Sequence, residues 1–289
     1  MQSDRGLFDR YVVVDWSASA TPTTGRDSIW VADLGAAGSP ALHNPSTRAQ
    51  AASILEELTT GAGRDRVLIG FDAGLGYPSG TADLFGLAGS PWAAMWGAVT
   101  ERMVDDDRNR NNRFEVASAF NLLAFDRSGG DARGPFWGCP SDRFGETLGR
   151  TKPSSFPLAE YREVEQHLRS TGRHPKSCWQ LLGAGSVGSQ TLTLLPILHR
   201  LLDRVDVWPF TTGLRFPDGD QRVVVAEIWP KMFVTEIPLG TVPDAAQVSG
   251  TAEALRRADR AGELADWFEP SATDRLAVER EEGWILGVR

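Results

Sequence analysis

The sequence predicts an α/β fold in which a mixed β-sheet is flanked by helices. Two observations predict it: short β-branched apolar runs recur along the chain, and segments with helical spacing lie between them. The chain has 289 residues, of which 41% are hydrophobic and 24% are charged. These proportions are typical of a globular protein and exclude a wholly disordered or collagen-like chain.

The first quarter of the chain predicts a hairpin followed by a helical crossover. Strands are expected at residues 11–14, 28–32, 41–43 and 66–72. Between the last two, a turn at 44–46 precedes Ala51, Leu55 and Leu58, whose spacing of four and three is that of one helix face. Because hairpins join antiparallel strands and helical crossovers join parallel ones, the predicted sheet is mixed.

The rest of the chain predicts a long insertion and then further strands and helices. Residues 79–175 are rich in Gly, Pro and polar residues, and we expect them to form an irregular insertion or cap within a single domain that spans residues 1–289. The elements expected after residue 78 are helices at about 91–104, 158–170, up to 202 and 250–268, and strands at 205–208 and 223–229.

The composition limits the classes of function. Thirty basic and 38 acidic residues give a net charge of −8, which disfavours tight, nonspecific binding of long nucleic acid, because phosphates reward clustered Lys and Arg. Two Cys are too few for a disulfide framework, and the four His form no cluster with metal-ligand spacing. The first residues lack the apolar region of a signal peptide, and no run approaches the ~18 apolar residues of a membrane-spanning helix. We therefore expect a cytoplasmic protein with no membrane partner.

Three acidic residues are notable for their positions. Asp15 ends the first predicted strand, Asp72 ends the strand after the first helix, and Glu227 lies inside the apolar run 223–229. A buried carboxylate is costly unless it is paired, hydrogen-bonded or bound to a metal. Neighbouring strands would bring the three to one edge of the sheet, and converging carboxylates are ligands that Mg²⁺ or Mn²⁺ prefers. The alternative for each aspartate alone is a turn or cap residue.

The same segments resemble a known family. The blocks Val13–Ala18, Ile69–Pro78 and Glu227–Pro230, in the order strand-Asp, hairpin, helix, strand-Asp, resemble the domain of unknown function 429 family, described as predicted nucleases of RNase H-like fold. Lys176–Gln190 and Glu282–Ile285 are similar to one of its branches. The resemblance implies an RNase H-like mixed sheet and a metal-dependent nuclease. Because the family's activity is itself inferred from its fold, it transfers as an analogy.

The resemblance also implies a further aspartate on a late helix, within a pattern such as Asp-Ala-Leu, that completes the acidic cluster. This chain has no clean copy of that pattern. Asp259 and Asp266 are the candidates, and we expect Asp259 to join the catalytic residues. The alternative for both is a solvated helix face.

A glycine-rich segment supports a different kind of site. Gly183–Gly188 matches G-x-G-x-x-G before an apolar helix, which is the pattern of a dinucleotide-binding turn. Pro196 falls inside that helix, and only about 100 residues follow the motif, so the motif alone is weak evidence. Two other interpretations remain open: a turn that holds a phosphate beside the acidic site together with Lys176, or a purely structural turn.

Together these features predict a metal-dependent phosphodiester hydrolase. Asp15, Asp72 and Glu227 would bind Mg²⁺ or Mn²⁺ to activate water. The phosphate of a nucleic acid or of a small phosphorylated ligand would contact Ser17, Lys176, Gly185 and Ser186. Two alternatives stay open: a noncatalytic nucleotide- or anion-binding protein of the same fold, and a dinucleotide-cofactor enzyme that uses Gly183–Gly188.

Overall fold

The computed structural model describes residues 6–129 and 133–289, which adopt a mixed α/β fold. Within these residues, six strands form one sheet in the order β3-β2-β1-β4-β6-β5. The predicted mixed sheet with flanking helices is therefore confirmed. The strands are β1 (Arg10–Asp15), β2 (Trp30–Gly35), β3 (Ala41–His43), β4 (Val67–Asp72), β5 (Val205–Val207) and β6 (Val223–Glu227).

The strand directions follow from the connections. β2 runs antiparallel to β1 and β3, as hairpin partners do, whereas β1, β4, β6 and β5 run parallel. Helix α1 (Arg48–Thr60) makes the crossover from β3 to β4. It begins after Thr47, whose side chain accepts a hydrogen bond from the Gln50 backbone N–H. The carboxyl ends of β1, β4 and β6 therefore meet at one edge of the sheet.

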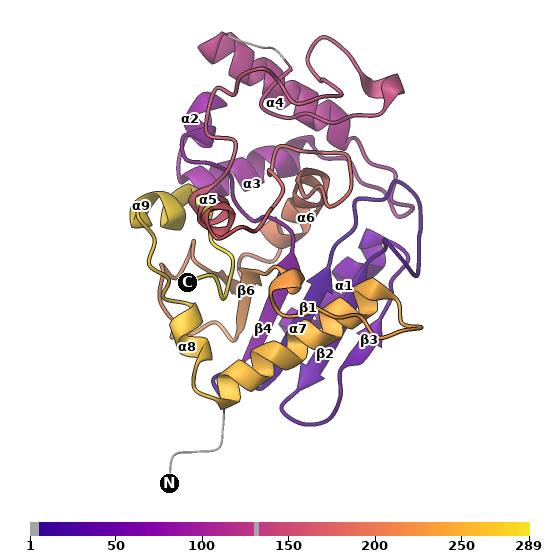
Figure 1. Ribbon diagram of the computed structural model, residues 1–289, viewed down its shortest axis with the longest axis vertical. Coiled ribbons are helices and arrows are strands. Elements are labelled where there is room, and N and C mark those ends of the chain that lie inside the picture. The colour runs from indigo at the N-terminus through magenta and orange to yellow at the C-terminus, as the bar shows by residue number, and fades with distance from the viewer. Residues whose placement is uncertain (1–5, 130–132) are drawn as a thin grey trace.

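Apolar clusters cover both faces of the sheet, because side chains alternate along each strand. On β1, Val12 and Val14 belong to one cluster, whereas Tyr11 and Val13 belong to the other. The first cluster also contains residues of α1, α3 (Pro91–Arg102), α4 (Arg113–Ser128) and α6 (Gly188–His199). The second contains residues of α5 (Glu163–Ser170), α8 (Leu264–Trp267) and α7 (Pro243–Arg260), which crosses the sheet in Figure 1.

The segment 79–175 is more regular than predicted. It contains α2 (Thr81–Leu84), α3, α5, the short turn η1 (Ser141–Arg143) and α4, which is absent from the predicted elements. Phe114, Ala117, Phe120 and Ala124 are buried on α4, and their spacing of three, three and four is that of one helix face. This apolar spacing in the sequence predicts α4, but the charged run before the helix obscures where the helix starts. In Figure 1, α2, α3 and α4 lie above the sheet.

The C-terminal segment packs beside the carboxyl end of β6. It follows α9 (Arg275–Ala277) and the π-helical turn η3 (Val278–Glu282). Ile285 then forms a bridge with Glu227, and the Leu286 backbone N–H donates to the Glu227 carbonyl oxygen at 2.8 Å. Gly76 is required where this segment meets the loop after β4, because a Cβ there would clash with the backbone of η3. No helix in the described ranges is long and apolar enough to cross a membrane.

Candidate functional site

The carboxyl edge of the sheet brings two of the predicted site residues together. β1 and β4 are parallel and in register, so Asp15 and Asp72 are direct partners at the ends of neighbouring strands. Both side chains are partly buried. Within the described part of the chain, no group donates a hydrogen bond to either carboxylate. The pair therefore offers acceptor oxygens that no described donor satisfies.

Burial makes both groups hold their protons more tightly than usual. Loss of hydration raises the pKa of Asp72 from 3.8 to about 7; nearby carboxylates add to this, and Lys231 opposes it. Loss of hydration also raises the pKa of Asp15 well above its usual range, and the Asp72 and Asp244 carboxylates raise it further. Like charges at short range favour the neutral acid, whereas a cation favours the carboxylate. A bound cation would therefore favour the charged form of both carboxylates.

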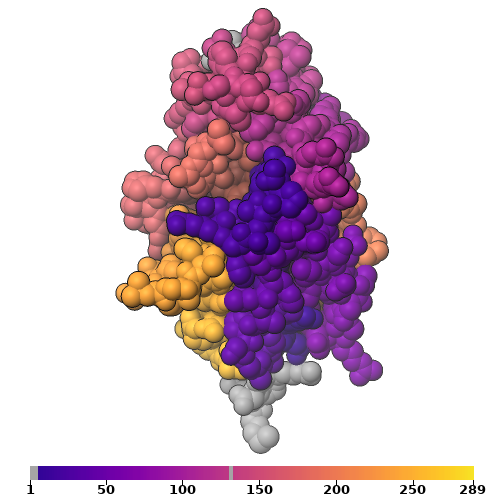
Figure 2. Space-filling view, turned by 90° about the vertical axis from the view of Figure 1, so that its right-hand side faces the viewer, coloured from indigo at the N-terminus to yellow at the C-terminus, as the bar shows by residue number. Residues whose placement is uncertain are grey.

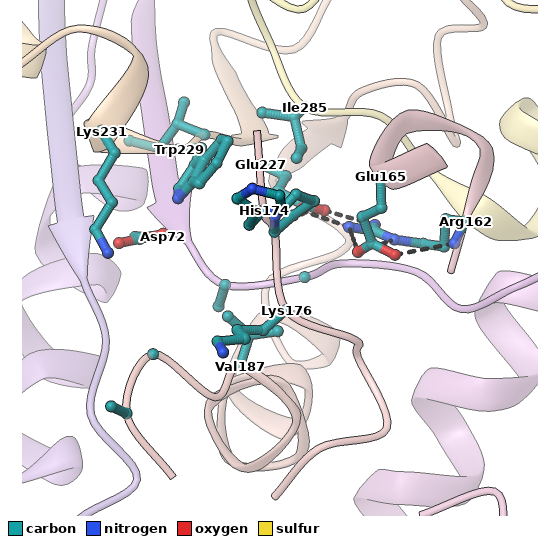
Figure 3. A pocket seen from close by; sticks show the side chains of 16 residues that line it. Asp72, Arg162, Glu165, His174, Lys176, Val187, Glu227, Trp229, Lys231 and Ile285 are labelled. Atoms are coloured by element: carbon teal, nitrogen blue, oxygen red, sulfur yellow. Dashed lines mark hydrogen bonds and ion pairs between the residues drawn. The ribbon is translucent and has the colours of Figure 1, made fainter. Parts of the chain in front are cut away.

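Glu227 lies at the same edge, but its carboxylate is occupied. Arg162 donates from Nη1 to Oε2 and from Nη2 to Oε1, each at 2.7 Å, and the Leu75 backbone N–H donates to Oε2 at 3.0 Å. Arg162 is 1% exposed, and a second carboxylate, Glu165, contacts it at 2.8 Å (Figure 3). The structure thus does not bring Glu227 into a metal site with the two aspartates, because a buried guanidinium takes both of its oxygens.

Two charged residues near the aspartate pair were not among the predicted site residues. Asp244 lies in the first turn of α7, and the Asp27 backbone N–H donates to its Oδ2 at 2.6 Å. This contact joins the N-terminal part of the chain to the start of α7, and Figure 2 shows the indigo and orange segments side by side. Lys231 lies in the turn η2 (Pro230–Met232) after β6, and Figure 3 shows its Nζ beside the Asp72 carboxylate.

A sequence signal for Asp244 exists. Proline at the first helical position and an acid in the first turn both mark a helix start, and Pro243-Asp244 has that form. The predicted start at about 250 misses it, because the apolar periodicity becomes clear only later in the helix. Lys231 carries no such signal, since its position depends on how the chain turns after β6.

A cavity of about 210 Å³ opens beside Asp72 (Figure 3). Arg162, Glu165 and Glu227 form part of its wall. Three other side chains give it positive or titratable groups: His174, Lys176 and Lys231. Lys176 and Gly185, both predicted phosphate contacts, line this cavity, whereas Ser17, Ser186 and Asp15 lie outside its wall.

The glycine-rich segment is a turn that lines part of this cavity. Gly183 has φ +121° and Gly185 has φ +70°, conformations that L side chains rarely adopt, and the Ser186 backbone N–H donates to the Gly183 carbonyl oxygen at 3.0 Å. A dinucleotide-binding turn follows a β-strand. Among the described residues, 179–182 form a turn with one isolated bridge and no strand, so the motif lacks that context.

Asp259 lies at the opposite end of α7 from Asp244. Its Oδ1 accepts from the Leu7 backbone N–H at 2.8 Å, its Oδ2 accepts from the Phe8 backbone N–H at 2.9 Å, and the Tyr11 hydroxyl also donates to Oδ2. The rise of 1.5 Å per residue puts it about 22 Å along the helix from Asp244. The structure therefore places Asp259 away from the aspartate pair, where its buried carboxylate anchors the chain before β1.

The remaining predicted residues make local contacts. The Ser17 hydroxyl donates to the Asp27 carbonyl oxygen at 3.4 Å and accepts from the Ser19 backbone N–H at 3.3 Å. Asp266, the other candidate late acid, is exposed on α8. The structure therefore places Asp72, Lys176 and Gly185 in the cavity wall, with Asp15 beside Asp72. Ser17, Ser186 and both late acids lie outside the wall.

Asp15 and Asp72 fit a hard divalent cation, because they offer neighbouring carboxylate oxygens that no donor in the described ranges satisfies. Across those same residues, no group of three or more His, Cys, Asp or Glu is placed to hold a metal ion. Mg²⁺ commonly binds through one or two carboxylates, several waters and substrate phosphates, so a pair is sufficient.

Comparisons with protein-family models, with curated proteins and with solved structures find no match to this chain.

Proposed function

We propose that this chain is a Mg²⁺- or Mn²⁺-dependent phosphodiester hydrolase with an RNase H-like sheet. The observation that carries the proposal is the in-register pair Asp15 and Asp72, which lacks donors among the described residues and adjoins a cavity with basic side chains. The resemblance to the domain of unknown function 429 family supports the same function by analogy. The order strand-Asp, hairpin, helix, strand-Asp on which it rests agrees with the strand order and register.

Each group near the pair has a distinct task in this proposal. Asp15 and Asp72 hold the cation, which when bound lowers the pKa of water and stabilises negative charge on phosphate oxygens. Lys231 and Lys176 reach the cavity from separate segments and hold the phosphate by charge-assisted hydrogen bonds. Asp244 Oδ2 is taken by Asp27, which leaves Oδ1 to accept a hydrogen bond from water.

The buried ionic cluster Arg162–Glu165–Glu227 has a positioning role. Glu227 Oε2 accepts from the Leu75 backbone N–H, and Leu75 lies three residues after Asp72. The cluster therefore fixes the loop that leaves β4 and, with it, the direction of the Asp72 side chain. A guanidinium held by two carboxylates is rigid, which suits a supporting element beside a reacting group.

The test is activity with a simple substrate. The wild type with Mg²⁺ or Mn²⁺ is expected to hydrolyse bis(p-nitrophenyl) phosphate, and Asp15→Asn or Asp72→Asn is expected to lose about 100-fold or more in kcat/KM. The same ions are expected to raise the Tm of the wild type and not that of Asp72→Asn. Asp266→Asn, which changes an exposed acid on α8, is the matched control. Equal turnover by Asp15→Asn, Asp72→Asn and wild type would contradict the proposal.

A noncatalytic anion-binding function is the second candidate. Two observations favour it. Lys231 places a positive charge beside Asp72 without a metal, and Glu227 is not free to act as a third ligand. In that case a nucleotide or inorganic phosphate would raise the Tm while no ester is hydrolysed with any divalent ion.

A further inference from the structure

We propose that the cavity beside Asp72 accepts a single nucleotide, with its base against Trp229 and its phosphate among His174, Lys176 and Lys231. The substrate would then be a mononucleotide ester or a chain end, and not the interior of a polymer. The hydrolysis of such a substrate rests on the proposed hydrolase function. The choice of a single nucleotide rests on the residues that line the cavity.

A buried ionic cluster forms one side of the cavity. Arg162, Glu165 and Glu227 form part of its wall, and their side chains are only 1%, 2% and 6% exposed. Ile285, which also lines the cavity, ties the C-terminal segment to β6. Figure 3 shows the ionic cluster on the opposite side of the cavity from Asp72 and Lys231. A polymer that ran past Asp72 in both directions would have to displace a buried, fully paired ionic cluster, which is costly.

The cavity has few basic side chains. Arg162 is already paired with two carboxylates, so the basic groups that remain among the described lining residues are His174, Lys176 and Lys231, of which Lys231 lies beside Asp72. Polymer binding rewards a long row of phosphate contacts, because each contact releases counterions. Three basic groups that line one cavity, on a chain with net charge −8, suit a single phosphate group instead.

Trp229 supplies a surface for a planar base. One part of this partly buried side chain packs against the apolar core, and another part lines the cavity. In Figure 3 its indole stands between Lys231 and His174. Within the described residues it makes no ring pair and its Nε1 donates no hydrogen bond. A base that stacks on such a ring gains affinity without sequence preference. The volume of about 210 Å³ limits the enclosed part of the ligand to about one nucleotide.

The first test measures binding by calorimetry without a divalent ion. Thymidine 5′-monophosphate is expected to bind about tenfold more tightly than ribose 5-phosphate, because only the nucleotide carries a base. Trp229→Ala is expected to abolish this preference, and Trp229→Phe is expected to retain most of it. Phe144→Ala, which removes an exposed ring outside the cavity wall, is the matched control. Equal affinity of the wild type for the two ligands overturns the proposal even if Trp229→Ala does not fold.

The second test asks whether a chain end is needed. With Mg²⁺ or Mn²⁺, the wild type is expected to release mononucleotides from a short linear single-stranded DNA and to leave a circular single strand of the same composition intact. Cleavage of the circle at a comparable rate overturns the proposal.

The two tests separate failure of this inference from failure of the hydrolase function. If no ester is hydrolysed while the Trp229-dependent preference for thymidine monophosphate holds, the hydrolase function fails and nucleotide recognition stands. If the circle is cut and ribose 5-phosphate binds as well as the nucleotide, the hydrolase function stands and this inference fails.

Discussion

At the residue scale, the protonation of Asp72 links the candidate site to stability. Burial raises the pKa of Asp72 to about 7 in the folded chain, compared with 3.8 for an ordinary aspartate. A group that binds its proton more tightly in the folded state favours folding at low pH. That contribution is fully present below about pH 4 and is lost as the pH rises to about 7. The site therefore costs stability at neutral pH unless a cation binds there.

Asp72→Asn is expected to stabilise the ion-free protein at pH 8 and to leave it unchanged below pH 4. One pKa unit corresponds to about 1.4 kcal/mol, and because the Asp72 side chain is only partly buried we expect a gain of about 2 kcal/mol rather than the full shift. Urea unfolding at both pH values in a metal chelator checks this. A variant that loses stability at pH 8 would show that Asp72 makes favourable contacts as a carboxylate.

The buried Arg162 gives a second prediction at this scale. Arg162→Met is expected to lower the free energy of unfolding by about 3–5 kcal/mol, because it leaves Glu165 and Glu227 buried without their partner. Arg143→Met, which breaks an exposed ion pair with Glu115, is the matched control and is expected to cost less than about 1 kcal/mol. Urea unfolding measures both, and similar losses in the two variants would contradict a special role for the buried cluster.

At the element scale, helix α7 has different tasks at its two ends. Its first turn brings Asp244 close to the acid pair, whereas Asp259, near its last turn, receives backbone N–H groups from the residues before β1. Between them Val248, Ala252 and Leu255 are buried against the sheet. The apolar face sets the direction of the helix, and that direction decides which acid reaches the site.

Isosteric changes at the two ends of α7 are expected to separate stability from function. Asp259→Asn should lower the free energy of unfolding by about 1–3 kcal/mol, because a buried charged acceptor is lost, and should leave the Mg²⁺-induced rise in Tm intact. Asp244→Asn should change stability by less than about 0.5 kcal/mol and should reduce that rise in Tm. Denaturation and thermal melts with and without Mg²⁺ measure both effects. The reverse pattern would show that the two acids exchange roles.

At the scale of the whole molecule, the C-terminal segment joins the helices above the sheet to the sheet itself. Glu281 accepts from the backbone N–H groups of Gly80 at 2.7 Å and Ala82 at 2.6 Å. Glu282 accepts from those of Ser79 at 2.9 Å and Glu163 at 2.6 Å. Two carboxylates near the end of the chain thus hold the starts of α2 and α5, so the wall of the cavity depends on residues far apart in sequence.

Glu281→Gln is expected to loosen this connection. An amide has one acceptor oxygen in place of two, so at least one of the two backbone hydrogen bonds is lost, at a cost of about 2 kcal/mol. Amide exchange in residues 79–84 should become faster, while exchange in β4 stays slow. Glu56→Gln, an exposed change on α1, is the control. Unchanged exchange in residues 79–84 would contradict the role of Glu281.

The sequence by itself determined the strands along the chain and the positions of Asp15 and Asp72 at strand ends, because these depend on local patterns: β-branched runs, helix spacing and an acid where a strand ends. The order of the strands in the sheet came from the tertiary structure. It could not predict that Arg162 takes both oxygens of Glu227, a contact across 65 residues, or that Asp259 anchors the residues before β1, across 251 residues in its contact with Phe8. Only the tertiary structure decided that Glu227 is paired with a guanidinium while Asp15 and Asp72 receive no hydrogen bond from the described residues. Partners so far apart in sequence meet only when strands and helices pack.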